Sequence, residues 1–266
     1  MAIKLPAKAV SPVSLEEYLV FLDEQVDCTD PDSLVGSAPM LRRLAANRGF
    51  LGQWFAERFL RNGSAFQRGN DYNFQSIVLA VTDHYLLRAN FWKPLSGIQD
   101  RSGLESDAFG YGVAHNHSFH LLTIGYVGSG YETDMYRLSD PEPIYDVGEK
   151  VELESRGTWH LGLGEMMFYE AYADVHSQIA PTDLSVSLNL MTHSRRDALP
   201  QYTFDVSTGQ VLSLVGSPLD VRVQLLSLAR LLIPDEADAE LRAIRDRDPS
   251  SRLRMLARDA LGEPQR

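Results

Sequence analysis

The sequence predicts a mainly β protein with helices at both ends, and two features of its pattern indicate this. From about residue 72, apolar and polar residues alternate in short runs separated by Gly, Pro, Asp and Ser, which is typical of the many short strands of a sandwich or barrel. On either side of this region, apolar residues recur with the period of an α-helix. We therefore divide the chain into a helical flank at 1–70, a β-barrel domain at 71–215 and a helical extension at 216–266.

The first flank carries the patterns of two helices. Ser14 followed by Glu17 forms a capping box, in which each side chain satisfies a backbone N–H at the helix start. Apolar residues then recur at helical spacing over 15–26, and a second apolar stripe runs over 41–60 before Asn62-Gly63 offers a helix stop. We expect this second stripe, which is rich in aromatic residues, to cover an edge or end of the following sheet.

The β region contains six alternating runs that predict strands. Side chains of a strand point alternately to its two faces, so an alternating run is typical of a strand with one buried face. The last run alternates without a fault. The predicted strands lie near 76–82, 84–92, 120–127, 131–138, 166–175 and 184–190.

Helical patterns return in the last fifty residues or so. Ser217-Pro218 and Asp248-Pro249 each place a capping residue before a proline, an arrangement favoured at a helix start. We expect these helices to cover the barrel or to support a homodimer, because no residue pattern there indicates chemistry.

Composition limits the class of protein. With 266 residues, of which 44% are apolar, the chain is long enough to bury a sizeable core. Its formal net charge of −11 argues against binding to nucleic acid or to anionic lipid, since both need clustered Lys and Arg. We therefore expect neither nucleic acid nor membrane among its partners.

The cysteine content and the first residues bear on the compartment. Cys28 is the only cysteine in the sequence, so neither an intramolecular disulfide nor a thiolate cluster can form. The N-terminal residues lack the long apolar core of a signal peptide, and no apolar run approaches the roughly 18 residues of a membrane span. We expect a cytoplasmic protein.

The histidines indicate where chemistry lies. Five of the seven fall between positions 115 and 176, and neutral imidazole is a strong ligand for iron, copper, zinc and nickel. His115 and His117 stand two residues apart, so on a strand both point to one face within reach of one ion. His176 ends another alternating run and is our candidate for the third ligand. A polar strand face without metal is the alternative interpretation of the pair.

Two stretches resemble the motifs of the cupin superfamily. Residues 115–128 are similar to its first motif, with His-x-His, a short apolar strand and a glycine turn. Residues 164–176, which begin Gly164-Glu165 and end at His176, are similar to its second motif, although the Pro and Gly usual before that histidine are replaced. The resemblance covers about a third of the chain. It implies a double-stranded β-helix, or jelly-roll, barrel that holds one divalent metal on His115, His117 and His176.

One departure from the cupin pattern restricts the set of metal ligands that we expect. Where many cupins place a glutamate ligand, this chain has Leu121 or Leu122, and leucine cannot bind a metal. Such a site resembles the thiol dioxygenases and related cupins, in which three neutral histidines hold ferrous iron. Glu132, just beyond a glycine turn, is our candidate for an added ligand or, preferably, for an acceptor of an imidazole N–H.

Three further side chains are candidates for catalytic roles. Arg88 lies on the polar face of the run 84–92; if that face points into the barrel, its guanidinium can bind a substrate carboxylate, and if it points outward the strand is simply solvated. Glu170 and Tyr172 share the parity of His176 on the predicted strand 166–175, which makes them candidate acid, base or hydrogen-bonding groups.

The leading hypothesis is a mononuclear non-haem iron oxygenase of the dioxygenase type, acting on a small polar or amino-acid-like substrate with dioxygen. Fe(II) is the expected metal, with zinc, nickel, manganese and copper as alternatives. The competing hypotheses are a metal-dependent cupin isomerase, lyase or hydrolase that needs no oxygen, and a non-catalytic ligand-binding cupin. The sequence does not identify the substrate.

Overall fold

The computed structural model describes most of the chain. Statements about structure refer to this described part, which comprises residues 2–62, 75–95, 106, 109–142, 144–192, 200–215, 226, 229–231, 233–248, 254, 257–258 and 260–263.

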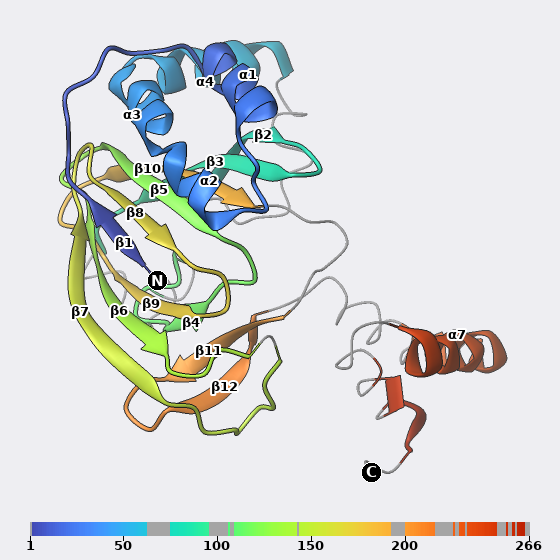
Figure 1. The fold of residues 1–266 in the computed structure, drawn as a ribbon. Helices are drawn as coiled ribbons and strands as arrows, with labels where there is room; N and C mark the ends of the chain where they lie inside the picture. The colour runs from blue at the N-terminus through green and yellow to red at the C-terminus, as the bar shows by residue number, and fades with distance from the viewer. Residues whose placement is uncertain are drawn as a thin grey trace.

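Within the described residues, the centre of the molecule consists of two six-stranded antiparallel sheets (Figure 1). In spatial order, sheet A contains β1 (Ile3–Leu5), β8 (Met166–Tyr169), β5 (Leu121–Val127), β10 (Ser185–Thr192), β3 (Tyr85–Trp92) and β2 (Ser76–Val81). Sheet B contains β12 (Gln210–Val215), β11 (Gln201–Asp205), β4 (His115–Asn116), β9 (Asp174–Ile179), β6 (Tyr131–Leu138) and β7 (Leu153–Leu161).

The pairing of the eight strands from β3 to β10 defines the fold. They pair like one long hairpin, with β6 against β7, β5 against β8, β4 against β9, and β3 against β10. Successive segments of this double strand alternate between the sheets, and the pairs β5–β10 and β6–β9 complete each sheet. This is a double-stranded β-helix, the jelly-roll barrel predicted from the sequence, and the fold class is confirmed.

One predicted strand is wrong in its extent, and the error matters for the site. The run 166–175 is not continuous, because β8 belongs to sheet A and β9 to sheet B. Between them the chain turns at residues 171–173, where Tyr172 has a φ of 62°. A non-glycine residue in this left-handed region is uncommon, and here it reverses the regular alternation of faces.

The N-terminal region differs from the two expected helices. It contains α1 (Leu15–Gln25), α2 (Pro31–Gly36), α3 (Ala38–Ala46) and α4 (Phe50–Asn62). The predicted capping box at Ser14 and Glu17 is present at the start of α1. Asp30 starts α2 by accepting hydrogen bonds from two backbone N–H groups, ahead of a proline at the first helical position. The region is not wholly helical, because β1 pairs with β8 in sheet A.

The helices pack on the outer face of sheet A. Leu22 of α1 and Leu44 of α3 share one hydrophobic cluster with Leu188 of β10 and Ile124 of β5. Figure 1 shows these helices on one side of the sheet, away from sheet B. The described apolar residues of the stripe up to Leu51 pack on the outer face of sheet A and not on an edge or end as expected, and Phe55 is exposed. The outer face of sheet A and these helices form the largest apolar core of the described residues.

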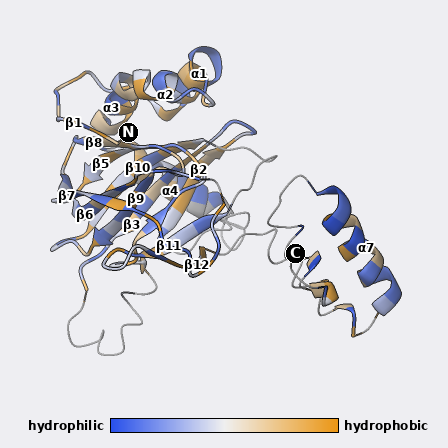
Figure 2. Cartoon of the chain, turned by 60° about the horizontal axis from the view of Figure 1, so that its bottom comes forward, coloured by the Kyte–Doolittle hydropathy of each residue, from blue (hydrophilic) through white to orange (hydrophobic). Residues whose placement is uncertain are grey.

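At the other end of the chain lies α7 (Pro234–Arg247), which Figure 2 shows as largely hydrophilic. Its apolar residues Leu241 and Ile244 pack with Ala257 in a cluster of their own. The predicted helix starts at Ser217-Pro218 and Pro249 lie outside the described residues. None of the described helices has the length and apolar character needed to cross a membrane.

Candidate metal centre

The structure brings together the three histidines that the sequence nominated. His115 lies on β4 directly opposite His176 on β9, and His117 follows at the end of β4. One ring nitrogen from each residue lies within 4.8 Å of the others. Among the described residues, these three form the group of His, Cys, Asp or Glu side chains that could hold a metal ion. The spacing of two along β4 and the β4–β9 pairing together create this arrangement.

Burial keeps the three imidazoles neutral. It lowers the pKa of His115, and it lowers the pKa of His117 and of His176 well below the ordinary value for histidine. The cause is the loss of hydration that an imidazolium would suffer in this environment. His176 is only 2% exposed, whereas His115 remains partly exposed at the surface. Because neutral imidazole is the form that binds metals, the site is in the binding state at neutral pH.

A chain of hydrogen bonds orients two of the rings. Gln178 Nε2 lies 2.9 Å from His176 Nδ1, His176 Nε2 lies 2.9 Å from His117 Nε2, and His117 Nδ1 lies 2.9 Å from Gln201 Oε1. One set of protons satisfies the whole chain: the Gln178 amide donates to His176, His176 donates to His117, and His117 donates to Gln201. His117 Nε2 is then the acceptor in this metal-free arrangement. To bind a metal through Nε2, His176 must instead carry its proton on Nδ1, with the Gln178 amide turned so that its oxygen accepts that proton.

His115 has a backbone partner instead. Its Nδ1 lies 2.9 Å from the carbonyl oxygen of Val113, which accepts the Nδ1–H proton and leaves Nε2 with its lone pair. A hydrogen-bond partner on the second ring nitrogen is typical of histidines that ligate metals. His115 and His117 therefore each have an oxygen acceptor for this N–H, whereas the amide nitrogen of Gln178 faces Nδ1 of His176.

These residues fit a metal ion. Metal–nitrogen bonds are about 2.0–2.1 Å long, so two ligands at a right angle lie about 3 Å apart, close to the 2.9 Å between the Nε2 atoms of His117 and His176. No carboxylate of the described residues joins the group. The leucines at the usual glutamate position are buried in apolar clusters, Leu121 inside the barrel and Leu122 under the helices. A three-histidine donor set is the result, and it does not identify the metal.

Arg88 faces the barrel interior. Its neighbours of the same parity on β3, Leu86 and Trp92, belong to the inner cluster between the sheets. In addition to burial, the positive charge of Arg88 acts to lower the pKa of His115 and of His117. The sequence left open whether the side chain of Arg88 points into the barrel or out to solvent. In the structure it points into the barrel.

Two tyrosines that the sequence analysis missed also lie on this inner wall. The ring of Tyr169 lies 4.7 Å from that of His176 between centroids, and its O–H lies 3.2 Å from Met167 Sδ. The ring of Tyr131 lies 4.4 Å from that of Trp92 between centroids. Burial raises the pKa of both phenols, so they stay protonated and keep an O–H to donate. The alternation of faces along the strand could have identified Tyr131, because it is the inward-facing neighbour of Glu132.

Glu132 itself lies on the wrong face for the role assigned to it. Tyr131 and Thr133 on β6 are buried, whereas Glu132 between them is exposed. Neighbouring side chains of a strand point to opposite faces, so Glu132 points to solvent when the residues beside it point into the barrel. The structure does not bring it to the three histidines, either as a ligand or as an imidazole partner.

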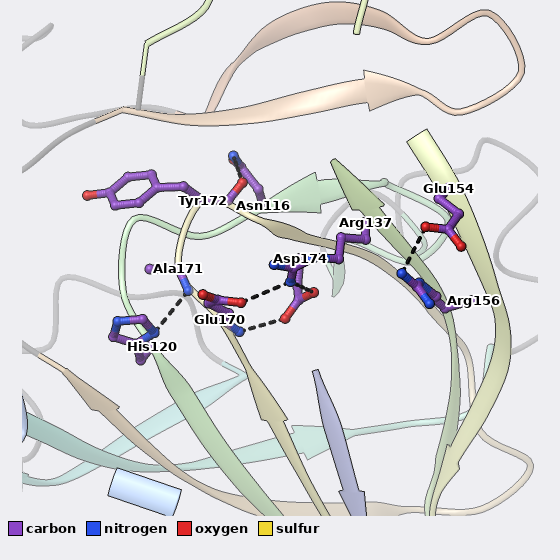
Figure 3. A network of polar contacts seen from close by, with 9 residues as sticks. All are labelled: Asn116, His120, Arg137, Glu154, Arg156, Glu170, Ala171, Tyr172 and Asp174. Carbon is purple, nitrogen blue, oxygen red and sulfur yellow. Dashed lines mark hydrogen bonds and ion pairs between the residues drawn. The ribbon is translucent and has the colours of Figure 1, made fainter. Parts of the chain in front are cut away.

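Glu170 lies in an ion-pair network and not in the histidine group, and the backbone N–H of Tyr172 donates a 2.7 Å hydrogen bond to the carbonyl oxygen of His117. Figure 3 shows Glu170 with Asp174 and Arg137, whose Nη1 lies 2.9 Å from Glu170 Oε2 and 3.1 Å from Asp174 Oδ1. Glu170 therefore belongs to an ion-pair network, and the side chain of Tyr172 points away from that network in the same view. The turn at 171–173 is the reason, because it ends the regular alternation on which both assignments depended.

His120 takes no part in the cluster, as its parity predicted. Its Nδ1 accepts a hydrogen bond of 3.1 Å from the backbone N–H of Ala171, as Figure 3 shows, and its ring stacks on Phe168. It supports the turn between β8 and β9.

No protein-family model and no curated protein sequence matches the chain. Among solved structures, it is similar to a hydroquinone 1,2-dioxygenase in complex with Cd²⁺ and 4-hydroxybenzonitrile, at 13% identity and a TM-score of 0.32 over 47% of this chain and 68% of that chain. It is also similar to a conserved protein with a double-stranded β-helix domain from Klebsiella pneumoniae, at 8% identity and a TM-score of 0.29 over 51% of this chain and 90% of that one.

A further solved structure, of DMSP lyases, is similar at 18% identity and a TM-score of 0.26 over 44% of this chain and 46% of that chain. At such identities and TM-scores, these similarities carry no weight for activity or substrate. The fold is established by the strand pairing, and the site by its own residues.

Proposed function

We propose that this protein is a metal-dependent cupin enzyme with a mononuclear non-haem iron centre on His115, His117 and His176, and that it acts as a dioxygenase on a small anionic substrate. The observation that carries the proposal is the group of three neutral imidazoles without a carboxylate. Three neutral ligands leave coordination positions of the ion free for substrate and oxygen, which suits ferrous oxygenase chemistry. Ferrous iron, when bound, supplies the binding and activation of dioxygen.

The charge of the site supports an anionic substrate. Three neutral imidazoles contribute no negative charge, so they leave both charges of a divalent cation uncompensated, and Arg88 adds a further positive charge on the same inner surface. The buried carboxylate of Asp174 is already paired with Arg137. An anion completes the charge balance, and a carboxylate matches the two parallel N–H donors of a guanidinium. Small carboxylates, including amino acids, are the expected class.

The surrounding side chains position the reactants. Arg88 binds the carboxylate of the substrate and thereby orients the rest of the molecule toward the three histidines. Tyr131 and Tyr169 keep their protons, and Tyr169, whose O–H donates to Met167 Sδ in this structure, has its ring beside His176. The buried aromatic and aliphatic residues of the inner cluster exclude water from the reacting groups, which strengthens these interactions.

The test is reconstitution with ferrous iron under anaerobic conditions, followed by oxygen uptake with a panel of small carboxylates and amino acids. We expect one iron per chain and substrate-dependent oxygen consumption. A His176→Ala variant should lose both, whereas His84→Ala, which removes an exposed histidine at the turn before β3, should retain both.

Each contrary outcome has a distinct meaning. A folded parent protein that retains no divalent metal contradicts the metal centre. Stoichiometric metal with turnover that needs no oxygen contradicts the dioxygenase proposal and favours a lyase, isomerase or hydrolase that uses the ion as a Lewis acid.

A further inference from the structure

Strand β4, which carries His115 and ends just before His117, is very short and depends on its neighbours for its position. Strand β4 consists of two residues, and its backbone pairs with β9 on one side and with β11 on the other. So short a strand forms few ladder hydrogen bonds, and other contacts must hold it in place.

Asn116, between the two histidines, supplies such contacts. Its side chain is 1% exposed and points away from the metal site. The Oδ1 atom accepts a hydrogen bond of 2.8 Å from the backbone N–H of Tyr202 on β11, and Nδ2 donates one of 3.3 Å to the backbone carbonyl of Tyr172 in the turn before β9. Figure 3 shows Asn116 beside Tyr172. One amide therefore ties β4 to both adjacent segments.

Gln201, at the start of β11, reaches the metal site itself. Its Oε1 lies 2.9 Å from His117 Nδ1 and is the acceptor that the Nδ1–H tautomer needs. That tautomer leaves Nε2 of His117 with its lone pair directed at His115 and His176. Strand β11 lies outside the eight strands of the double-stranded β-helix, so this contact comes from an addition to the barrel.

We propose that the hairpin of β11 and β12 is part of the metal site, with Gln201 and Asn116 as its positioning residues. Gln201 selects the tautomer and ring orientation of His117, and Asn116 fixes the position of β4 against β11. Partners of this kind typically contribute about 10- to 100-fold to metal affinity. The inference rests on the proposed three-histidine metal site, although its effect on His117 exists without metal.

The test measures cobalt(II) and zinc affinity by titration and, in the metal-free protein, the tautomer of His117 by long-range ¹H–¹⁵N NMR. We expect Gln201→Leu to weaken metal affinity by about 10- to 100-fold and to abolish the single Nδ1–H tautomer of His117. Gln201→Glu keeps an oxygen acceptor and should restore both properties. Asn116→Ala should weaken affinity in the same direction.

Gln210→Leu is the matched control, because Gln210 lies on β12 of the same hairpin and contacts the backbone of Gly148 rather than a histidine. It should leave affinity and tautomer unchanged. Unchanged values for Gln201→Leu would overturn the inference even if Asn116→Ala fails to fold. A parent protein that binds neither metal contradicts the proposed function instead, and the NMR comparison still decides the role of Gln201.

Discussion

The two faces of sheet A are built from the same strands but differ in the type of side chain that they bury. On β10, Leu188 and Leu190 point outward into the cluster beneath α1 and α3, whereas Ser187 and Asn189 point inward. The inward residues have polar partners: Ser187 accepts from Trp92 Nε1 at 3.0 Å, and Asn189 Oδ1 accepts from Thr123 Oγ1 at 2.5 Å. The outer face buries hydrocarbon, while the inner face combines aromatic rings with satisfied polar groups.

Because of this difference, we expect outward side chains of sheet A to contribute to stability and inward ones to contribute to the site. Aliphatic packing on the outer face removes apolar surface from water, which is the main source of folding free energy. The inner face of sheet A carries Arg88 and looks toward sheet B, which supplies the three histidines. Burial alone would disfavour these polar groups, so hydrogen bonds or a ligand must compensate. We therefore expect outer substitutions to change the free energy of unfolding and inner ones to change binding.

The largest expected effect is on metal affinity in His176→Ala. Zinc affinities of roughly 10–16 kcal/mol from four ligands correspond to about 2.5–4 kcal/mol per ligand, or on the order of 100- to 1,000-fold. Cobalt(II) titration of parent and variant measures the change, with His84→Ala as the control. A folded His176→Ala protein with the affinity of the parent would break the assignment of function to the inner face.

Next comes the outer face, where Leu188→Ala should lower the free energy of unfolding by about 2–5 kcal/mol, since it removes a fully buried side chain. Urea denaturation measures this change. Leu212→Ala, at a side chain that is 51% exposed, should change stability by less than about 0.5 kcal/mol. If Leu188→Ala folds but loses metal, the two faces are not separable in the way proposed.

Arg88→Met should weaken binding of the carboxylate substrate by about 10- to 100-fold, because hydrogen bonds to charged groups contribute roughly 1.5–3 kcal/mol. Metal affinity should not fall, since Arg88 is not a ligand. The KM in oxygen-uptake assays gives the first value, and cobalt(II) titration gives the second. Arg156→Met, at an arginine on β7 paired with Glu154 in Figure 3, is the matched control. Equal KM values for parent and Arg88→Met would exclude the anion role.

The smallest expected effect is the pH dependence of the free energy of unfolding of the metal-free protein. His117 and His176 have folded pKa values well below the ordinary 6.5, so the unfolded chain takes up protons first as the pH falls. Stability is greatest well above pH 6.5 and falls as the pH passes through this value, by about 0.7 kcal/mol for each histidine between pH 7 and pH 6. Urea titrations at several pH values measure this slope. His176→Gln should reduce it, and His84→Gln should not; a slope unaffected by His176→Gln contradicts the burial argument.

Much of the site could be predicted because strand parity is a local property. The spacing of His115 and His117 placed both on one face, and the same rule correctly excluded His120. Where the predicted strand was interrupted, the rule failed: the left-handed residue at Tyr172 ends the alternation, so Glu170 was assigned to the wrong environment. For Glu132, the alternation of β6 was available, and Tyr131 was the inward residue.

By itself, the sequence determined the β-rich barrel with an N-terminal helical cover, the absence of disulfides, and the pairing of two histidines on one strand. These depend on residue type and on short spacings along the chain. Only the tertiary structure decided the inward direction of Arg88, the presence of Tyr169 beside His176, and the contact of Gln201 with His117. Those features depend on residues far apart in the chain, because the double strand places sheets A and B face to face and β11 pairs with β4 at the side of sheet B.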